Sequence, residues 1–249
     1  MRIFRAQRMA EKVALVIGAG DGTGGAIAKR FAREGFVACV VRRTADKLGP
    51  LVSEIEAAGG RARAFGRDAR KEEHMVVLVE EIERDIGPIE VAAFNVGANV
   101  PASILEETAR KYFKIWEMAC FGGFLMGREV ARRMVARGRG TILYTGATAS
   151  VRGREYFAAF AGAKHALRAL AQSMARELGP KGIHVAHVII DGAIDTEFIR
   201  TSFPQVYARK DEGGILDPAH IADQFWMLHV QPRDTWTFEL DLRPWTENW

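Results

Sequence analysis

The sequence predicts an α/β fold, a doubly wound parallel sheet in a single domain. Short apolar runs typical of strands buried on both faces alternate with helix signals, and a glycine-rich turn joins the first apolar run to the first helix. The chain has 249 residues, 48% of them hydrophobic, which is enough for one sizeable core, and no Pro/Ser-rich linker divides it. We therefore expect one domain over residues 11–249.

In the first half of the chain, each predicted helix ends at a glycine. Gly35 closes the first helix as a C-cap would, Gly59 and Gly60 stop the second, and Gly87 before a proline breaks the third. The predicted strands cover residues 13–17, 36–41, 62–66 and 89–95. The predicted helices between them cover residues 24–34, 45–58 and 71–86.

The second half continues the alternation. Two long helices, near 103–136 and 155–178, flank a fifth strand at 141–145, and a sixth strand covers 184–190. A last strand is expected at 236–242, where apolar residues alternate as on a half-buried strand. This order predicts helices on both faces of a parallel sheet with right-handed crossovers.

Composition excludes several function classes. The net charge is +4 with dispersed basic residues, so we expect no nucleic-acid partner. Neither the two cysteines, Cys39 and Cys120, nor the histidines have the spacing of a disulfide framework or metal site. No apolar stretch approaches the roughly 18–20 residues that span a bilayer, and no secretory signal is visible, so we expect a cytoplasmic protein without a membrane partner. Residues 1–10 are expected to form a disordered leader, unless Met9 is the true start.

The glycine-rich turn predicts a dinucleotide site. Residues 18–24 read Gly-Ala-Gly-Asp-Gly-Thr-Gly between the first strand and the first helix. Glycines let the backbone turn tightly and approach a pyrophosphate, and the helix N-terminus supplies free N–H groups. The candidate phosphate-binding residues are Gly18, Gly20, Gly22, Thr23 and Gly24.

Residues 13–196 resemble the short-chain dehydrogenase/reductase family, because further motifs follow this turn in the family's order. Asp68, after the third strand, matches the acidic residue that contacts the adenine amino group, and Asn95 and Gly97 match the stretch beside the adenosine ribose. Ile194 and Thr196, after the sixth strand, match residues that face the nicotinamide. The resemblance implies a Rossmann-type fold, a nicotinamide cofactor and a small-molecule substrate.

The end of the second strand bears on the choice of cofactor. An acidic residue there normally holds the ribose 2′-hydroxyl and repels a 2′-phosphate, but this strand ends in Arg42 and Arg43. Arginine binds phosphate bidentately. We predict NADP(H) rather than NAD(H), and the alternative is that the arginines are ordinary surface charge.

The family's catalytic set is incomplete in this sequence. The resemblance places an Asn, a Ser, a Tyr and a Lys in the site, and the corresponding positions hold Cys120, Ala147, Phe160 and Lys164. The hydroxyl that gives and takes the proton is therefore replaced, while the lysine is present. Losing both hydroxyl donors to a substrate oxyanion costs orders of magnitude in the rate of carbonyl reduction.

Other groups could replace the missing acid. Lys164 can still bind the nicotinamide ribose, and Thr148 or Ser150 lies close in sequence to the empty Ser position. Tyr156 lies four residues before Phe160; in a helix it would share that face, and in a loop its phenol could fold over the pocket. The alternative for Tyr156 is a surface or pocket-wall aromatic.

Three functional hypotheses remain open. The first is an NADP-dependent oxidoreductase with a rebuilt proton donor, acting on a carbonyl or activated alkene. The second is an NADP(H)-binding pseudoenzyme that senses the cofactor or supports a complex, and the third is a structural module without nucleotide. Residues 197–216 correspond to the family's substrate loop and residues 236–249 to a C-terminal strand and tail. The resemblance also implies a homodimer or homotetramer.

Overall fold

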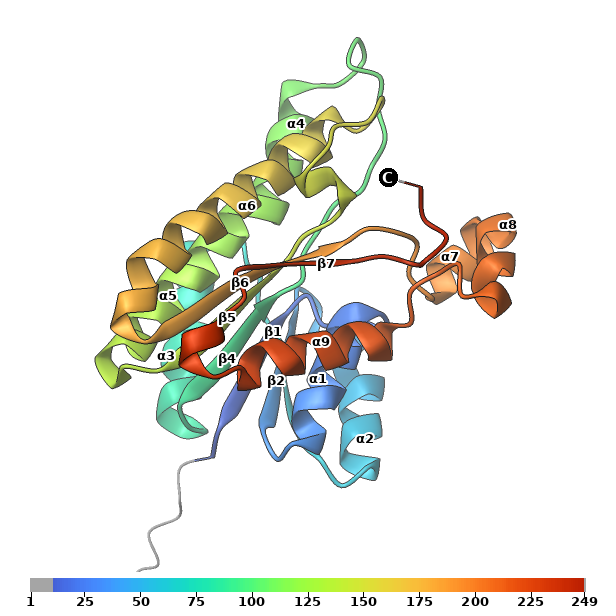
Figure 1. The fold of residues 1–249 in the computed structure, drawn as a ribbon. Helices are drawn as coiled ribbons and strands as arrows, with labels where there is room; N and C mark the ends of the chain where they lie inside the picture. Colours follow the sequence, from blue (N-terminus) through green and yellow to red (C-terminus); the bar gives the residue numbers. More distant parts are fainter. Residues whose placement is uncertain (1–10, 249) are drawn as a thin grey trace, which may run out of the picture.

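A seven-stranded parallel sheet forms the centre of the protein (Figure 1). The computed structural model describes residues 11–248, so the predicted leader at 1–10 lies outside the described residues. The strand order is β3-β2-β1-β4-β5-β6-β7, and every neighbouring pair is parallel. The strands are β1 (Val13–Ile17), β2 (Val37–Arg42), β3 (Arg61–Gly66), β4 (Ile89–Phe94), β5 (Gly140–Thr145), β6 (Ile183–Ile190) and β7 (Glu239–Leu242). The predicted fold class is confirmed.

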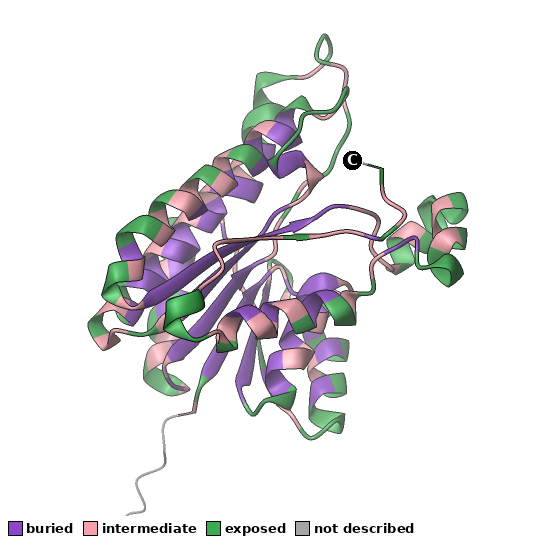
Figure 2. Ribbon diagram, viewed as in Figure 1, coloured by how far each residue is buried: buried purple, intermediate pink, exposed green. Residues whose placement is uncertain are grey.

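Helices cover both faces of the sheet because successive strand residues point to opposite sides. Leu15 belongs to one core cluster and its neighbour Val16 to the other, and both are fully buried. The first cluster is closed by α3 (Glu72–Asp85), α5 (Gly122–Arg137) and α6 (Ala158–Leu178). The second is closed by α1 (Thr23–Arg33), α2 (Gly49–Ala57) and α9 (Pro218–Val230). Figure 2 shows the buried strands between these two layers.

The chain reverses its direction across the sheet at β1, which lies between β2 and β4. From β1 the chain builds outward to β3, and from β4 it builds outward to β7. A crevice therefore opens beyond the carboxyl ends of β1 and β4, which is where open α/β sheets bind their ligands. The glycine-rich turn after β1 lies at this crevice.

The second half of the chain departs from the predicted element bounds. The helix expected near 103–136 is three pieces: α4 (Ala109–Trp116), a π-helical turn at Glu117–Phe121 and α5. The expected substrate loop contains α7 (Glu197–Ser202), α8 (Pro204–Tyr207) and a 3-10 turn at Ala208–Glu212. The last strand is only Glu239–Leu242, shorter than the expected 236–242.

The helix α9 was missed by the sequence prediction, although it has a clear start signal. Asp217 caps its N-terminus by accepting a hydrogen bond from the N–H of Ala219 at 2.7 Å, and Pro218 occupies the first turn. The helix buries Phe225 and Leu228 against α1 and the sheet.

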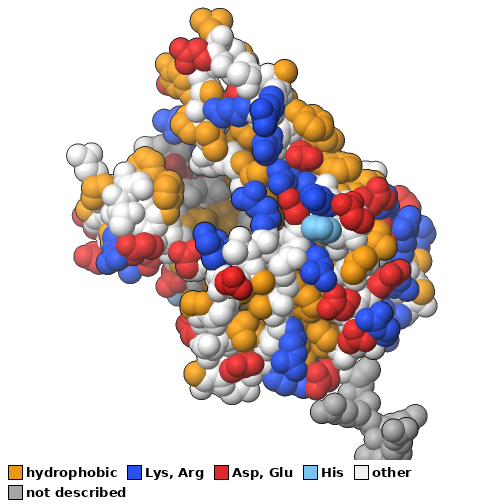
Figure 3. Space-filling model, turned by 180° about the vertical axis from the view of Figure 1, so that it is seen from behind, with side chains coloured by type: hydrophobic (Ala, Val, Ile, Leu, Met, Phe, Trp, Pro, Cys, Tyr) orange, Lys and Arg blue, Asp and Glu red, His pale blue; other side chains and the backbone are white. Residues whose placement is uncertain are grey.

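The surface carries mixed charge. On the face shown in Figure 3, lysine and arginine side chains are interspersed with aspartate and glutamate. Cys39 and Cys120 are both buried free thiols. No helix within residues 11–248 is long and apolar enough to cross a bilayer.

Candidate active site

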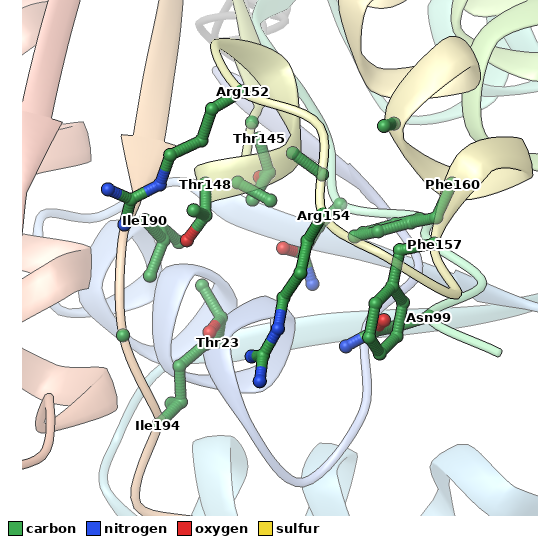
Figure 4. A pocket seen from close by; sticks show the side chains of 16 residues that line it. Thr23, Asn99, Thr145, Thr148, Arg152, Arg154, Phe157, Phe160, Ile190 and Ile194 are labelled. Carbon is green, nitrogen blue, oxygen red and sulfur yellow. The ribbon is translucent and has the colours of Figure 1, made fainter. Parts of the chain in front are cut away.

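A pocket of about 310 Å³ opens at the crevice beyond the strand ends (Figure 4). Its walls come from the start of α1, the ends of β4, β5 and β6, and the segment that leads into α6. The lining combines apolar side chains such as Phe160 and Ile190 with polar ones such as Thr23 and Asn95. The pocket therefore has the mixed character of a small-molecule site.

The glycine-rich turn is held against the end of β4. Gly18 has a φ of +85°, and a Cβ there would lie 2.5 Å from the carbonyl oxygen of Asn95. The Asn95 side-chain amide donates a hydrogen bond to the Gly18 carbonyl oxygen at 3.3 Å. At Gly20 a Cβ would meet open space, and the N-terminus of α1 has no side-chain cap at Gly22. The turn is thus packed on one side and open to an anion on the other.

A second pocket, of about 180 Å³, lies at the ends of β1 and β2. Arg42, Arg43, Asp68 and Gly97 all line it. Neither Arg42 nor Arg43 makes a side-chain hydrogen bond or ion pair within residues 11–248, although Arg43 interacts electrostatically with Asp68. Both guanidiniums are therefore available to an anionic ligand, as a 2′-phosphate site requires.

Asp68 already has a partner in this pocket. The guanidinium of Arg70 donates to both of its carboxylate oxygens, at 2.9 and 2.6 Å, and these bonds lower the pKa of Asp68 to about 2. The carboxylate is therefore ionised at neutral pH, and its remaining lone pairs can accept a hydrogen bond from an amino group.

Lys164 is buried beside the first pocket and does not itself line it, but the residue that accepts its shorter hydrogen bond, Thr145, does. Its ammonium donates to the carbonyl oxygens of Val96 at 3.2 Å and Thr145 at 2.8 Å, and only 3% of the residue is exposed. Two of its three hydrogens are thus used, and the third has no partner in the described part of the chain. Burial lowers the pKa of Lys164 to about 8.

The residues at the two positions where the resemblance places hydroxyls, Phe160 and Ala147, carry none, whereas the buried hydroxyl of Thr145 lines the pocket without a hydrogen-bond partner among the described residues. Phe160, one turn before Lys164, lines the pocket and is buried, and Ala147 lines it from the end of β5. A Cβ on Gly97 would contact both Lys164 and Phe160 at 3.7 Å, so the two side chains meet at the loop after β4. Cys120, from the π-helical turn, interacts electrostatically with Lys164, and burial raises its pKa to about 11.

Three nearby hydroxyls have different surroundings. Thr148 lines the pocket, and its hydroxyl donates to the carboxylate of Asp191. Ser150 is fully buried and accepts a hydrogen bond from the Ala147 N–H at 3.1 Å. Tyr156 precedes α6 in a left-handed conformation with a φ of 66°, is 57% exposed and does not line the pocket. Neither expected placement of Tyr156, on the Phe160 face of a helix or over the pocket, is therefore observed.

Several pocket residues were not singled out from the sequence. Arg152, Arg154 and Phe157 line the pocket from the segment before α6, and Asn99 lines it from the loop after β4. The two arginines had a local signal, because they are basic residues close in sequence to the Ser position. Ile194, a sequence-predicted cofactor residue, also lines the pocket, and Thr196 lies next to Gly22 and caps α7.

Comparison with known proteins gives the family. Residues 12–206 match the family described as short chain dehydrogenase. The chain belongs to this short-chain dehydrogenase family. The short-chain reductase protein NovJ of Streptomyces niveus is 32% identical over 76% of this chain and 71% of its own length.

Solved structures of short-chain dehydrogenases share the fold. A short-chain dehydrogenase from Rhodopseudomonas palustris is 50% identical, with a TM-score of 0.81 over 94% of this chain and 99% of that chain. The alcohol dehydrogenase of the archaeon Thermococcus sibiricus, solved with 5-hydroxy-NADP, is 25% identical with a TM-score of 0.84 over 96% of this chain and 98% of that chain.

Proposed function

We propose that the protein is an NADP(H)-dependent oxidoreductase that transfers hydride between the cofactor and a small carbonyl or activated-alkene substrate, with a non-standard proton donor. The observation that carries this proposal is the buried Lys164 ammonium, which donates to the carbonyl of Thr145, a residue that lines the pocket together with Thr23 of the glycine-rich turn. A charged group buried at a ligand crevice, with one hydrogen free, is a costly arrangement that a structural role alone does not require.

The described residues fit a nicotinamide dinucleotide. Gly20 and the uncapped start of α1 would hold the pyrophosphate, and Asp68 would accept from the adenine amino group. The guanidiniums of Arg42 and Arg43, neither of which makes a side-chain hydrogen bond among the described residues, favour a 2′-phosphate and therefore NADP(H) over NAD(H). The cofactor, when bound, supplies or accepts the hydride.

The residues that replace the usual acid favour reduction of an activated alkene. We infer that Ala147 and Phe160 stand at the family's Ser and Tyr positions, so an alkoxide would find neither hydroxyl donor. Hydride addition to the β-carbon of an enone leaves an enolate, which needs less stabilisation than an alkoxide. The same residues thus disfavour ketone–alcohol exchange and tolerate alkene reduction.

We assign the role of proton donor to Lys164. An acid is most effective when its pKa lies near the working pH, and burial brings the ammonium close to that range. The hydroxyl proton of Thr148 is directed at Asp191, so Thr148 would have to rotate before it could donate to a substrate. Tyr156 would have to move inward from its exposed position. Water held by Lys164 is the remaining source of a proton.

An NADP(H)-binding pseudoenzyme is the second candidate function. The specific observation in its favour is that Ala147 and Phe160 line the pocket with side chains that carry no hydroxyl. This candidate keeps the cofactor residues and predicts tight NADPH binding with no turnover. The homo-oligomeric state and the cytoplasmic location stay predictions.

The test has two stages. Purified protein is titrated with NADPH and separately with NADH, followed by nicotinamide fluorescence, and NADPH consumption is then measured with a panel of enones, enals and ketones. The proposal predicts a clear NADPH preference and consumption with at least one enone or enal, abolished in Lys164→Ala. Consumption lost in Tyr156→Phe instead would assign the proton to Tyr156. Binding of neither cofactor contradicts both candidate functions.

A further inference from the structure

Two arginines reach the pocket from the segment between the 3-10 turn Thr148–Ser150 and α6. Arg152 and Arg154 are separated only by Gly153, and both line the cavity. Figure 4 shows their side chains diverging, with Arg152 on the side of Thr148 and Arg154 projecting into the pocket. No aspartate or glutamate of the described residues lines the same cavity, so the charged side chains of its lining are both cationic.

The two guanidiniums differ in their partners. Arg152 donates to the carboxylate of Asp191 at 3.3 and 3.4 Å, and Asp191 is a buried acid that also accepts from Thr148. Asp191 therefore offsets the charge of Arg152. Arg154 makes no side-chain hydrogen bond or ion pair within residues 11–248. Arg154 is an exposed residue at the rim of the cavity, and no carboxylate of the described residues pairs with it.

The remaining walls are largely apolar. Phe157 and Phe160 come from the start of α6 and the residue before it, and Ile190 and Ile194 come from β6 and the loop that follows it. Such walls favour a hydrocarbon skeleton, because burying apolar surface is favourable and these side chains offer no hydrogen bonds. A ligand that matches the walls around Phe157 and Phe160 has an apolar body and one anionic end, while Ile194 is left to the cofactor.

We propose that this pocket selects substrates that carry a carboxylate on an apolar body, with the carboxylate bound by Arg154. A planar guanidinium binds a carboxylate through two parallel hydrogen bonds, and one unpartnered guanidinium matches one such group. The reacting carbon would then lie deeper, toward Phe160 and the glycine-rich turn. The inference names the substrate class of the proposed function and rests on it, but carboxylate binding can be measured without turnover.

The test compares matched ligands that differ only in charge. A series of carboxylic acids with four to eight carbons, aliphatic and aromatic, is titrated against the primary amides of the same acids by calorimetry, with and without saturating NADPH. The variants are Arg154→Ala, Arg154→Lys and Arg154→Glu. Arg176→Ala is the control, because Arg176 is an exposed arginine in the last turn of α6, outside the pocket.

The proposal predicts that at least one carboxylate binds about tenfold or more tightly than its amide, as a charge-assisted pair requires. Arg154→Ala and Arg154→Glu should remove this difference, Arg154→Lys should retain part of it, and Arg176→Ala should leave it unchanged. Equal binding within every pair, or no carboxylate binding at all, overturns the proposal. An Arg154→Ala protein that loses NADPH affinity but keeps its carboxylate preference also overturns the proposal, since Arg154 would then bind the cofactor.

The outcomes separate this proposal from the proposed function. A wild-type protein that binds neither NADPH nor NADH but prefers carboxylates contradicts the oxidoreductase and supports the carboxylate site. A protein that consumes NADPH with neutral enones and shows no carboxylate preference supports the oxidoreductase and contradicts the carboxylate site.

Discussion

The ammonium nitrogen of Lys164 lies 5.9 Å from the centre of the Phe160 ring, one turn earlier on the same face of α6. This relationship places a cation and an aromatic ring where the resemblance described above places a lysine and a tyrosine. A tyrosine at position 160 would add one oxygen to a ring that is already in the pocket. If Phe160 stands at the family's Tyr position, as proposed, only the hydroxyl of the usual acid is missing.

Restoring the two hydroxyls should therefore create carbonyl reduction. We expect Phe160→Tyr combined with Ala147→Ser to raise NADPH-dependent ketone reduction by about a hundredfold or more over the wild type, since a positioned acid and an oxyanion donor each contribute about that much. The measurement is NADPH consumption with a panel of ketones. Adding Lys164→Ala to the double variant should remove the gain. No gain with any ketone would show that the pocket itself has diverged.

The rate of the proposed reduction should fall as the pH rises through about 8. Lys164 donates its proton only as the ammonium, and burial lowers its pKa to about 8 from the usual value of 10.5. The protonated fraction is therefore nearly complete at pH 6 and small at pH 10. A pH profile of single-turnover reduction checks this. Lys164→Arg keeps a positive charge but cannot donate a proton at these pH values, so the reduction should be lost, whereas reduction that persists with an unchanged alkaline limb would assign the proton to another group.

NADPH preference should depend on Arg42 and Arg43. Replacing either by alanine removes an unpartnered guanidinium from the pocket near the end of β2 and should weaken NADPH binding by about tenfold or more, while NADH binding stays nearly unchanged. Fluorescence titration of both cofactors checks this. Arg63→Ala is the control, because Arg63 is an exposed residue of β3 outside this pocket. An equal loss of affinity for both cofactors would show that the arginines do not bind the 2′-phosphate.

The fold was predictable because its signals are local. Buried runs such as residues 13–17 and breakers such as Gly35 fix the strand and helix order with no knowledge of distant contacts. The break between α4 and α5 was not predictable, because the π-helical turn at Glu117–Phe121 lies inside one continuous helix signal. The same limit applies to α9. Its apolar residues are not confined to one face, so no helical period stands out in the sequence, although Asp217 marks its start.

The candidate site was predictable only in part, for a different reason. Position in the family motif brought out Lys164, Phe160 and Ala147. It could not show that the Thr148 hydroxyl would donate a hydrogen bond to Asp191, because that bond joins residues far apart in sequence. Nor could it show the unpartnered side chain of Arg154, since the absence of a partner is a property of the folded structure.

Stability should fall as the pH drops from about 6.5 toward 4.5. Burial lowers the pKa of His187 to about 4 and that of His229 to about 4, so in this range the unfolded chain binds protons that the folded protein does not. The free energy of unfolding then decreases with falling pH, by up to about 2–3 kcal/mol per pH unit for the two residues together. Urea unfolding at a series of pH values measures this.

A single substitution separates the histidine effect from carboxylate titration. The His229→Asn variant should show a clearly smaller slope than the wild type in the same pH range, whatever its stability at neutral pH, because His187 and His184, whose pKa values burial also lowers, carry the rest of the slope. The acids with lowered pKa values, Asp68 and Glu239, lose their contribution at lower pH, because their unfolded pKa values lie near 4. A slope unchanged by His229→Asn would contradict a buried neutral imidazole at this position.

Hydride transfer itself is the most direct test of the central claim. NADPH carrying deuterium at C4 of the nicotinamide, on the transferred face, is incubated with the protein and a set of enones and enals, and the products are examined by mass spectrometry. We predict deuterium at the β-carbon of at least one product and none with Lys164→Ala. Tight NADPH binding without deuterium in any product would contradict the oxidoreductase and leave the cofactor-binding pseudoenzyme.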